Sequence, residues 1–598
     1  MTHREKEVPS VDFCDIPSQQ PTGLYLSSAC AESESDGASA ETVDGMVTRL
    51  LSRKEMLGSQ KALDAVAKEA RGLESKGTWD LSSVIDREEL INDVRKRNHP
   101  IHVGKLMSIC SEKFAELSED QRVLKGRVVY RGDDTRDEYG AAAVFQDLQS
   151  NPASIQAANC TIAYGRLLGN KITSADAVKA YVQANLRSKR DTWIELPPEL
   201  RPKDWGSKYK RPMVRLVKAL YGHPESGAHW EQHLTEVLVR LGGKAIPEMP
   251  SAFFFEETGL LLTVYVDDFL LSGPERAHAP FWEKLEKDVE IEGVAGLERF
   301  LGRHHELVAA PADLCVRAGS KGEQEAVAFD MRAYVRSACQ LYEDLAGKKL
   351  KGAPTPFLPD SSLPPCDDEE EGQLAGDACK ILMKNLWVAR LARPDLLRPI
   401  TALASKVTKW NKNCDRALHR LMQYMHRSAD FLMLGWANDD VKDVYLELFV
   451  DANFAGDKED AKSTSGGWLV LKGPNTCFPL AWVSRKQTST ARSTTESEVI
   501  ALAHSLFQEA IPVHALFRTV LRRDLVLKIR EDNQATIKVV CKGYSSKLRH
   551  VGRVHKIDLS SIKEEIDKDD VDLEYVGTDD QCADVLPRLL NHKSGGLR

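Results

Sequence analysis

The stretch LLLTVYVDDFLLSG, residues 260–273, places two adjacent carboxylates, Asp267 and Asp268, inside an otherwise apolar run. The β-branched and aromatic residues predict two strands, over 260–266 and 269–271, joined by a hairpin with the acids at its turn. Asp is common in turns, so an ordinary reverse turn is one interpretation. However, Asp-Asp is a poor two-residue hairpin turn, and two like charges between buried strands repel each other unless a cation binds them. The doublet is therefore a candidate site for a divalent metal ion.

The length and composition indicate a multidomain globular protein. The chain has 598 residues, 42% of them hydrophobic and 28% charged, and a prior of about 150 residues per domain predicts three or four units. No apolar run of roughly 18 residues could span a bilayer, and the N-terminus lacks the apolar core of a signal peptide. The twelve cysteines are scattered without zinc-finger spacing, as expected for reduced intracellular thiols. Because the net charge is −8, nucleic-acid binding would have to rest on local basic patches.

Changes in composition divide the chain. Residues 1–50 are rich in Ser, Ala and acids, which predicts a disordered leader. A stretch rich in Pro, Ser and acids at 352–372 predicts a linker between two halves, and the helical spacing of apolar residues over 376–430 predicts a mostly helical segment.

A two-metal site in the first half needs a third carboxylate, and Asp176 is the candidate. It follows a strand-like run in KITSADAVKAYVQANL, residues 171–186, and precedes Tyr181 by five residues. Taken alone, Asp176 is most simply a surface residue, so its assignment depends on its context.

A second set of acids follows residue 444. VYLELFVDANFAGD, residues 444–457, predicts a strand, and two further strand-like runs predict an antiparallel meander. Ser493-x-x-Glu496 is a capping box that begins a helix, and LVLKIREDNQATIKVV, residues 525–540, predicts a strand, an acid and a helix. The acids that this β-β-β-α-β-α order places at strand or helix ends are Asp451, Glu498, Asp532 and Asp584. Such a set could hold two Mg²⁺ ions across one scissile phosphate.

These motifs together resemble the reverse transcriptase and RNase H regions of copia-type LTR-retrotransposon Pol polyproteins. In the first half the resemblance rests on YVDD, on the Asp-x-x-x-Ala-Tyr segment at 176–181, and on TWDL (78–81), TWIELPPEL (192–200), LVKALYGHPESGAHW (216–230) and RFLGR (299–303). In the second half it rests on DANFAGDKEDAKSTSGGWLV (451–470), VSRKQTSTARSTTESEVIAL (483–502) and EDNQATI (531–537).

The resemblance implies an α+β multidomain fold. A right-hand polymerase with fingers, palm and thumb would be followed by a helical connection and an RNase H-like α/β domain with a mixed five-stranded sheet. The implied boundaries are a leader at 1–50, fingers and palm at 51–310, a thumb remnant and linker at 311–375, a helical connection at 376–440 and the RNase H-like domain at 441–598.

For the polymerase half, the resemblance implies that Asp176, Asp267 and Asp268 are the catalytic, metal-binding triad, in which Asp176 and Asp267 bind both metals and Asp268 is the supporting, less demanding third acid. Tyr181 matches the steric-gate position, where the family usually has Phe. The fingers segment LKGRVVYRG, residues 124–132, would direct Lys125, Arg127 and Arg131 to the incoming triphosphate, and a solvated charged face explains these cations equally well. The family writes Asp-Val-Lys-Asn-Ala-Phe where this chain has Asp-Ala-Val-Lys-Ala-Tyr, so the packing behind Asp176 is a point of divergence.

For the second half, the resemblance implies that Asp451, Glu498, Asp532 and Asp584 are the catalytic, metal-binding acids, with Glu496 and Asp580 outside the site. The Lys-His pair of the family is inverted here to His555-Lys556, and we expect His555 to be an ordinary surface residue. Two basic strips are candidates for nucleic-acid binding, although a solvated loop explains the first almost as well; they contain Lys208, Lys210, Arg211 and Arg215, and Lys547, Arg549 and Arg553.

The implied cofactors are two Mg²⁺ ions per active site, with Mn²⁺ as the alternative ion. The implied partners are an RNA template, a DNA primer, an RNA-DNA hybrid and deoxynucleoside triphosphates, with no membrane. The expected location is intracellular and cytoplasmic, with a virus-like particle and the nucleus left open, and the sequence indicates no oligomeric state. The rival interpretation is a decayed or domesticated, non-catalytic nucleic-acid-binding protein, which the changes at 177–179 and His555 favour and the presence of all seven acids opposes.

Overall fold

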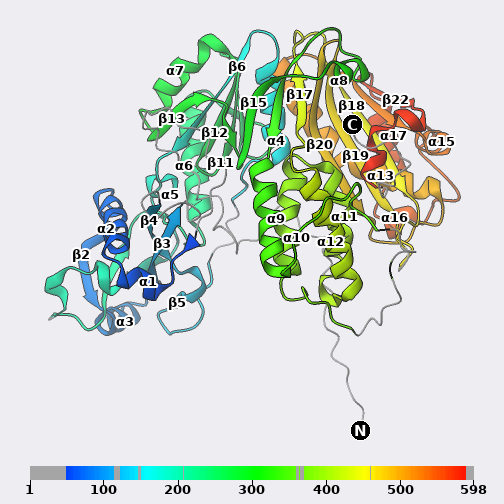
Figure 1. Ribbon diagram of the computed structural model, residues 1–598. Coiled ribbons are helices and arrows are strands. Elements are labelled where there is room, and N and C mark those ends of the chain that lie inside the picture. The colour runs from blue at the N-terminus through cyan, green and yellow to red at the C-terminus, as the bar shows by residue number, and fades with distance from the viewer. Residues whose placement is uncertain are drawn as a thin grey trace.

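The computed structural model describes most of the chain, namely residues 49–113, 122–145, 150–206, 208–358, 363, 370–457 and 460–587. The predicted leader lies outside the described residues except for Arg49 and Leu50. Those two residues form strand β1 (Arg49–Leu50), which pairs with β3, so the expectation of disorder is wrong for them. Figure 1 shows three sheets, arranged from the lower left to the upper right of the view.

The first sheet belongs to the N-terminal part of the chain. Its strands run in the order β1, β3 (Ile101–Lys113), β7 (Asp191–Glu195), β8 (Pro212–Leu216) and β2 (Trp79–Asp86), and β4 (Val123–Tyr130) and β5 (Arg136–Asp137) also pair with β3. Helices α1 (Arg53–Gly58), α2 (Gln60–Ser75) and α3 (Arg87–Lys96) accompany it. Helix α2 buries Val66, Ala70 and Leu73 at helical spacing and packs on β4. Gly126 permits this close approach, because a Cβ there would lie 2.4 Å from the Val66 backbone nitrogen.

The second sheet contains the apolar run 260–273 with its two adjacent acids. Its order is β13 (Ile291–Gly296), β6 (Asn170–Ala177), β12 (Asp268–Pro274), β11 (Leu260–Tyr265), β10 (Ala252–Phe255) and β9 (Lys244–Ala245). Side chains of β11 alternate between two cores, since Leu261 joins the core that includes α4 (Ile155–Arg166) whereas Leu260 and Leu262 join the core of α6 (Ser226–Arg240) and α7 (Glu275–Leu285). Both faces of the sheet are covered, which explains why the run is continuously apolar.

The third sheet has nine strands instead of the five predicted. The expected strands are present as β18 (Tyr445–Asn453), β19 (Thr464–Gly473), β20 (Thr476–Lys486), β21 (Leu527–Glu531) and β22 (Val571–Tyr575), antiparallel in β18–β20 and parallel across β18, β21 and β22. Four earlier strands extend the sheet beyond β20, namely β14 (Arg299–Phe300), β15 (Arg303–Ala309), β16 (Glu325–Asp330) and β17 (Met433–Ala437). Because β17 pairs with both β16 and β20, the edge of β20 is covered.

The α-helices that lie between β16 and β17 in the sequence form one bundle. They are α9 (Arg332–Ala346), α10 (Ala378–Leu391), α11 (Leu397–Ala404) and α12 (Lys412–Arg427), and α9 packs on both α10 and α12 (Figure 1). The predicted boundary at residue 375 therefore runs through a single packed bundle. The segment expected to be a thumb remnant and linker also contains α8 (Ala312–Arg317) and β16.

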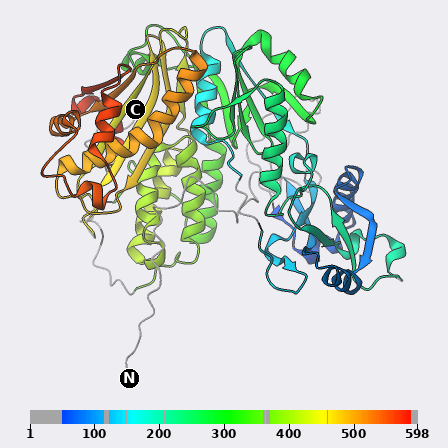
Figure 2. The ribbon, with the colours of Figure 1, turned by 180° about the vertical axis from the view of Figure 1, so that it is seen from behind.

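The helices of the C-terminal part are α13 (Thr494–Ser505), a π-helical turn (Leu506–Ala510), α14 (Ile511–Leu521), α15 (Gln534–Lys542), α16 (Val551–Val554) and α17 (Leu559–Ile566). The run Thr494–Leu521 is long and apolar enough to cross a membrane by length and composition, so the expectation that no run could do so is wrong on these two criteria. Most of it is nevertheless buried, because α13 packs on β18 and β19 and α14 contacts α4, as the orange helix in Figure 2 shows. This is the environment of a core helix.

One hydrophobic core joins the second sheet, the helical bundle and the third sheet. Arg303 of β15 is fully buried at this junction, where it donates to Asn159 Oδ1 of α4 and to the Leu391 carbonyl of α10, both at 2.7 Å. Asn159 in turn donates to the Leu480 carbonyl of β20 at 3.1 Å. The two acid-bearing sheets are therefore tied through α4.

Candidate active sites

The turn between β11 and β12 differs from the predicted one by one residue. Tyr265 pairs with Asp268, so Val266 and Asp267 form the turn and Asp268 is the first residue of β12. Val266 has φ +60°, a conformation that β-branched residues rarely adopt. Trp230 of α6 donates its indole Nε1–H to the Val266 carbonyl at 2.6 Å and so helps to hold the turn.

The structure brings Asp176, Asp267 and Asp268 together. Asp176 on β6 is the cross-strand partner of Asp268, and their carboxyls share a hydrogen bond. The pKa of Asp268 lies well above its ordinary value of 3.8 because the side chain is buried and because Asp267 and Asp176 are close. The carbonyl of Asp267 accepts from the Ala177 N–H at 2.7 Å, which fixes the turn against β6. A half-buried cluster of carboxylates is a donor set that suits a hard divalent cation.

Tyr181 lies five residues after Asp176, on the short helix α5 (Ala180–Gln183) that follows β6. The helix follows Lys179, which has φ +51° and whose Nζ is 2.7 Å from Glu69 Oε2 of α2. A mostly apolar cavity under the turn is lined by Tyr181, Trp230 and Val266, among others.

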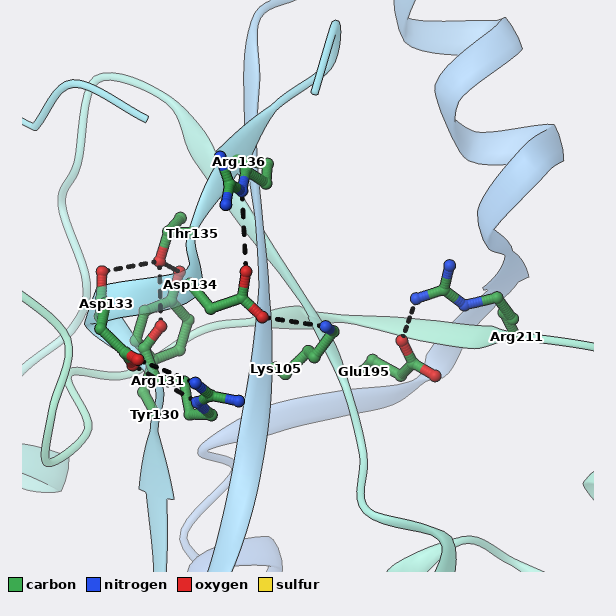
Figure 3. A network of polar contacts seen from close by, with 10 residues as sticks. Lys105, Tyr130, Arg131, Asp133, Asp134, Thr135, Arg136, Glu195 and Arg211 are labelled. Atoms are coloured by element: carbon green, nitrogen blue, oxygen red, sulfur yellow. Dashed lines mark hydrogen bonds and ion pairs between the residues drawn. The ribbon is translucent and has the colours of Figure 1, made fainter. Parts of the chain in front are cut away.

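Several of the cations predicted to bind nucleotide or template form ion pairs with nearby acids. Figure 3 shows this for Arg131 and Arg211. Arg131 is 2.8 Å from Asp133, and Arg211 is 2.6 Å from Glu195. The other ion pairs of the predicted strip are Arg215 with Asp191 at 3.0 Å and Lys208 with Asp204 at 3.3 Å, while the backbone N–H of Lys210 donates to Asp86. Lys125 and Arg127 lie on β4 opposite Ser111 and Ile109 of β3.

The second acidic cluster is assembled from three elements. One carboxylate oxygen from each of Asp451, Glu498 and Asp532 lies within 4.8 Å of the other two. Asp451 is near the end of β18, Glu498 is in the first turns of α13, and Asp532 directly follows β21. Parallel pairing of Val450 with Glu531 brings the ends of β18 and β21 side by side. Three converging carboxylates again form a donor set for a divalent cation.

The fourth predicted acid, Asp584, is not part of that compact group. It lies in a 3-10 turn (Cys582–Val585) that contacts β18, and Gln581 just before it donates to the Val450 carbonyl at 2.8 Å. The turn therefore docks beside the strand that carries Asp451.

Glu531 is a further acid at this site that was not predicted from the sequence. Its side chain is fully buried, and burial raises its pKa well above the ordinary value of 4.5, with the charges of Asp532 and Asp451 acting in the same direction. The alternation of Leu527, Ile529 and residue 531 along β21 would have predicted an inward side chain.

The expectation that His555 is a surface residue is wrong. Its side chain is 2% exposed, and its Nε2 lies 3.4 Å from Glu496 Oε1, which His550 Nε2 contacts at 2.9 Å. The reason is that α16 brings the segment back onto the start of α13, where Glu496 also accepts from the Arg492 N–H at 2.9 Å. The basic strip around α16 is exposed, and within the described part of the chain no ion pair involves Lys547 or Arg553. Arg549 donates to the Tyr544 hydroxyl at 2.7 Å.

Known proteins match both halves of the chain. Residues 116–318 match the family model described as reverse transcriptase (RNA-dependent DNA polymerase). The transposon Ty1-DR6 Gag-Pol polyprotein of Saccharomyces cerevisiae is 24% identical over 569 residues, covering 90% of this chain and 29% of the relative. The truncated transposon Ty1-A Gag-Pol polyprotein of the same yeast is 23% identical over 552 residues, covering 90% of this chain and 42% of the relative. This chain thus spans less than half the length of either relative.

Among solved structures, the foamy viral protease-reverse transcriptase in complex with double-stranded DNA is similar with a TM-score of 0.40 and 12% identity, covering 82% of this chain and 69% of that one. The family match and the long alignments with the yeast polyproteins agree with each other. The chain is a relative of copia-type retrotransposon Pol polyproteins and carries a reverse transcriptase domain.

Proposed function

We propose that the chain is an RNA-directed DNA polymerase with a separate ribonuclease H site. The observation that carries the proposal is the presence of two distinct carboxylate clusters, each at strand ends of a different sheet. A reverse transcriptase domain over 116–318 supports the first activity, because it includes Asp176, Asp267 and Asp268.

In the polymerase site, Asp176, Asp267 and Asp268 would hold two Mg²⁺ ions, with Mn²⁺ as the alternative. Bound there, the ions supply charge neutralisation for in-line attack of the primer 3′-oxygen on the α-phosphate of a deoxynucleoside triphosphate. The chain contributes position, because β6 and β12 fix two of the acids in register and the hydrogen bond from Trp230 fixes the turn. Tyr181 would crowd a 2′-hydroxyl on the incoming nucleotide. The cations facing the triphosphate would be Lys125, Arg127 and Arg131. Arg131 would first have to break its ion pair with Asp133.

In the nuclease site, Asp451, Glu498 and Asp532 would hold the metal ions, with Asp584 brought closer from its docked turn. The substrate would be the RNA strand of an RNA-DNA hybrid, and the exposed strip of Lys547, Arg549 and Arg553 would contact its backbone. The corresponding strip of Lys208, Lys210, Arg211 and Arg215 would contact the template. We assign fingers and palm to the first two sheets, and place the protein in the cytoplasm or in a virus-like particle.

A primer-extension assay tests the proposal. With poly(rA)/oligo(dT), Mg²⁺ and dTTP, we expect incorporation, and with a labelled RNA-DNA hybrid we expect cleavage of the RNA strand. A chain that binds the hybrid but neither extends nor cleaves would instead be a non-catalytic nucleic-acid-binding protein, the alternative that the sequence leaves open.

A further inference from the structure

Tyr181 has an aromatic neighbour that comes from a different part of the chain. The ring of Tyr221 lies edge-on to the ring of Tyr181, with centroids 4.7 Å apart and planes inclined by 71°. Such edge-to-face pairs have a preferred geometry, because the positive edge of one ring meets the negative face of the other. The contact therefore restricts the orientations that the Tyr181 ring can adopt.

The backbone on both sides of Tyr221 is fixed. Two residues earlier, the Ala219 N–H donates to the Ala184 carbonyl at 3.0 Å, directly after the helix that carries Tyr181. The carbonyl of Tyr221 itself accepts from the Tyr130 N–H at 2.8 Å, at the end of β4. Tyr221 thus links the short helix α5 to the strand that carries Lys125 and Arg127.

Gly222 permits this close link between the two backbones. It has φ +88°, and a Cβ there would lie 2.1 Å from the Tyr130 carbonyl oxygen, so only glycine fits. The close approach of the two backbones sets the position from which the Tyr221 side chain projects.

We propose that Tyr221 is a positioning residue for sugar selectivity, holding the Tyr181 ring where it excludes a 2′-hydroxyl. The inference rests on the proposed polymerase function. Exclusion of one oxygen atom requires a ring that stays in place, and a tyrosine that is free to rotate would yield to the extra atom. Tyr221 itself does not need to touch the nucleotide.

The test compares incorporation of dTTP and UTP on poly(rA)/oligo(dT), as the ratio of the two kcat/KM values. We expect Tyr181→Ala to remove the preference for dTTP and Tyr221→Leu to lower it by about tenfold, mainly through a lower KM for UTP. Tyr221→Phe keeps the ring and should keep the preference. The matched control is Phe281→Leu, which removes one ring of a pair with centroids 4.9 Å apart and planes at 72° in the core between β10 and α7. It should lower stability and leave the ratio unchanged.

The outcomes distinguish failure of the proposed polymerase function from failure of the proposed role of Tyr221. If the unaltered chain incorporates no nucleotide, the polymerase function and this inference both fail. If it incorporates dTTP selectively and Tyr181→Ala lowers the ratio while Tyr221→Leu does not, only the inference is overturned. An equal loss of selectivity in Phe281→Leu would overturn it as well, since reduced stability would then explain the effect.

Discussion

Asp176 and Asp268 are direct cross-strand partners on β6 and β12, and their carboxyls share a hydrogen bond in a half-buried site. Directly opposite side chains lie about 5 Å apart at their Cβ atoms, a distance at which like charges destabilise a sheet. Burial and the charge of Asp267 add to this cost, which is why the pKa of Asp268 is raised. The register of the sheet thus holds the acids together at the expense of stability, as expected where a cation is to be bound.

The two acidic clusters predict separable activities. Asp267→Asn should reduce primer extension by about a hundredfold or more and leave cleavage of a hybrid intact, because loss of a metal ligand removes several kcal/mol of transition-state stabilisation. In EDTA, Asp268→Asn should melt at a higher temperature than the unaltered chain, since a neutral amide replaces one of the three crowded acids. Asp532→Asn should instead reduce cleavage of a hybrid and leave extension intact. If either substitution abolished both activities, the assignment of two independent sites would be wrong.

The sequence predicted which acids come together in space better than it predicted the backbone that carries them. The apolar run at 260–273 predicted two strands and a hairpin, but turn propensity placed the turn on the acids, whereas the structure places it on Val266 and Asp267. That choice depends on tertiary contacts, among them the bond from Trp230 to Val266, that no local rule contains. Pairing of β17 with β16 and β20 is equally non-local, so the extension of the third sheet gave no sequence signal.

The left-handed conformation of Val266 predicts an unusual response to glycine. A β-branched residue at φ +60° carries about 1–3 kcal/mol of strain that glycine would relieve, so Val266→Gly should cost little stability. Val264 is the matched control, because it is buried in β11. Val264→Gly loses about 1.5–3 kcal/mol of side-chain burial and adds the entropy cost of glycine in a strand. We expect thermal melting to show a clearly larger loss for Val264→Gly, and equal losses would mean that the turn is unstrained.

The two basic strips should contribute differently to nucleic-acid binding. Lys547 and Arg553 form no ion pair within the described residues, whereas Arg211 and Arg215 are paired with Glu195 and Asp191. Each cation that neutralises a phosphate adds roughly 0.7–0.9 to the slope of log affinity against log salt. We therefore expect Lys547→Ala and Arg553→Ala each to lower that slope for an RNA-DNA hybrid by nearly one unit. Arg211→Ala and Arg215→Ala should change it less, because those cations must first leave their acids, and the reverse order would contradict the role of the α16 strip.

The contact between α4 and the π-helical turn predicts a pH-dependent junction. Gln156 of α4 donates through Nε2 to both the carbonyl and the carboxylate of Glu509, each at 3.0 Å. Burial raises the pKa of Glu509 from 4.5 to about 7, although Arg390 acts in the opposite direction. Below about pH 4.5 the carboxyl is protonated in the folded and the unfolded chain alike, so it makes no difference to stability.

As the pH rises from 4.5 toward 7, the unfolded chain loses this proton more readily than the folded one, and stability falls. Above pH 7 the penalty is constant. Glu509→Gln keeps an acceptor for Gln156 and removes the titration. We measure melting temperatures of the unaltered chain and of Glu509→Gln between pH 4.5 and 8. The two values should be equal near pH 4.5 and differ increasingly as the pH rises, with the variant more stable at pH 8. Parallel curves across this range would show that Glu509 ionises as easily in the folded chain as in the unfolded one.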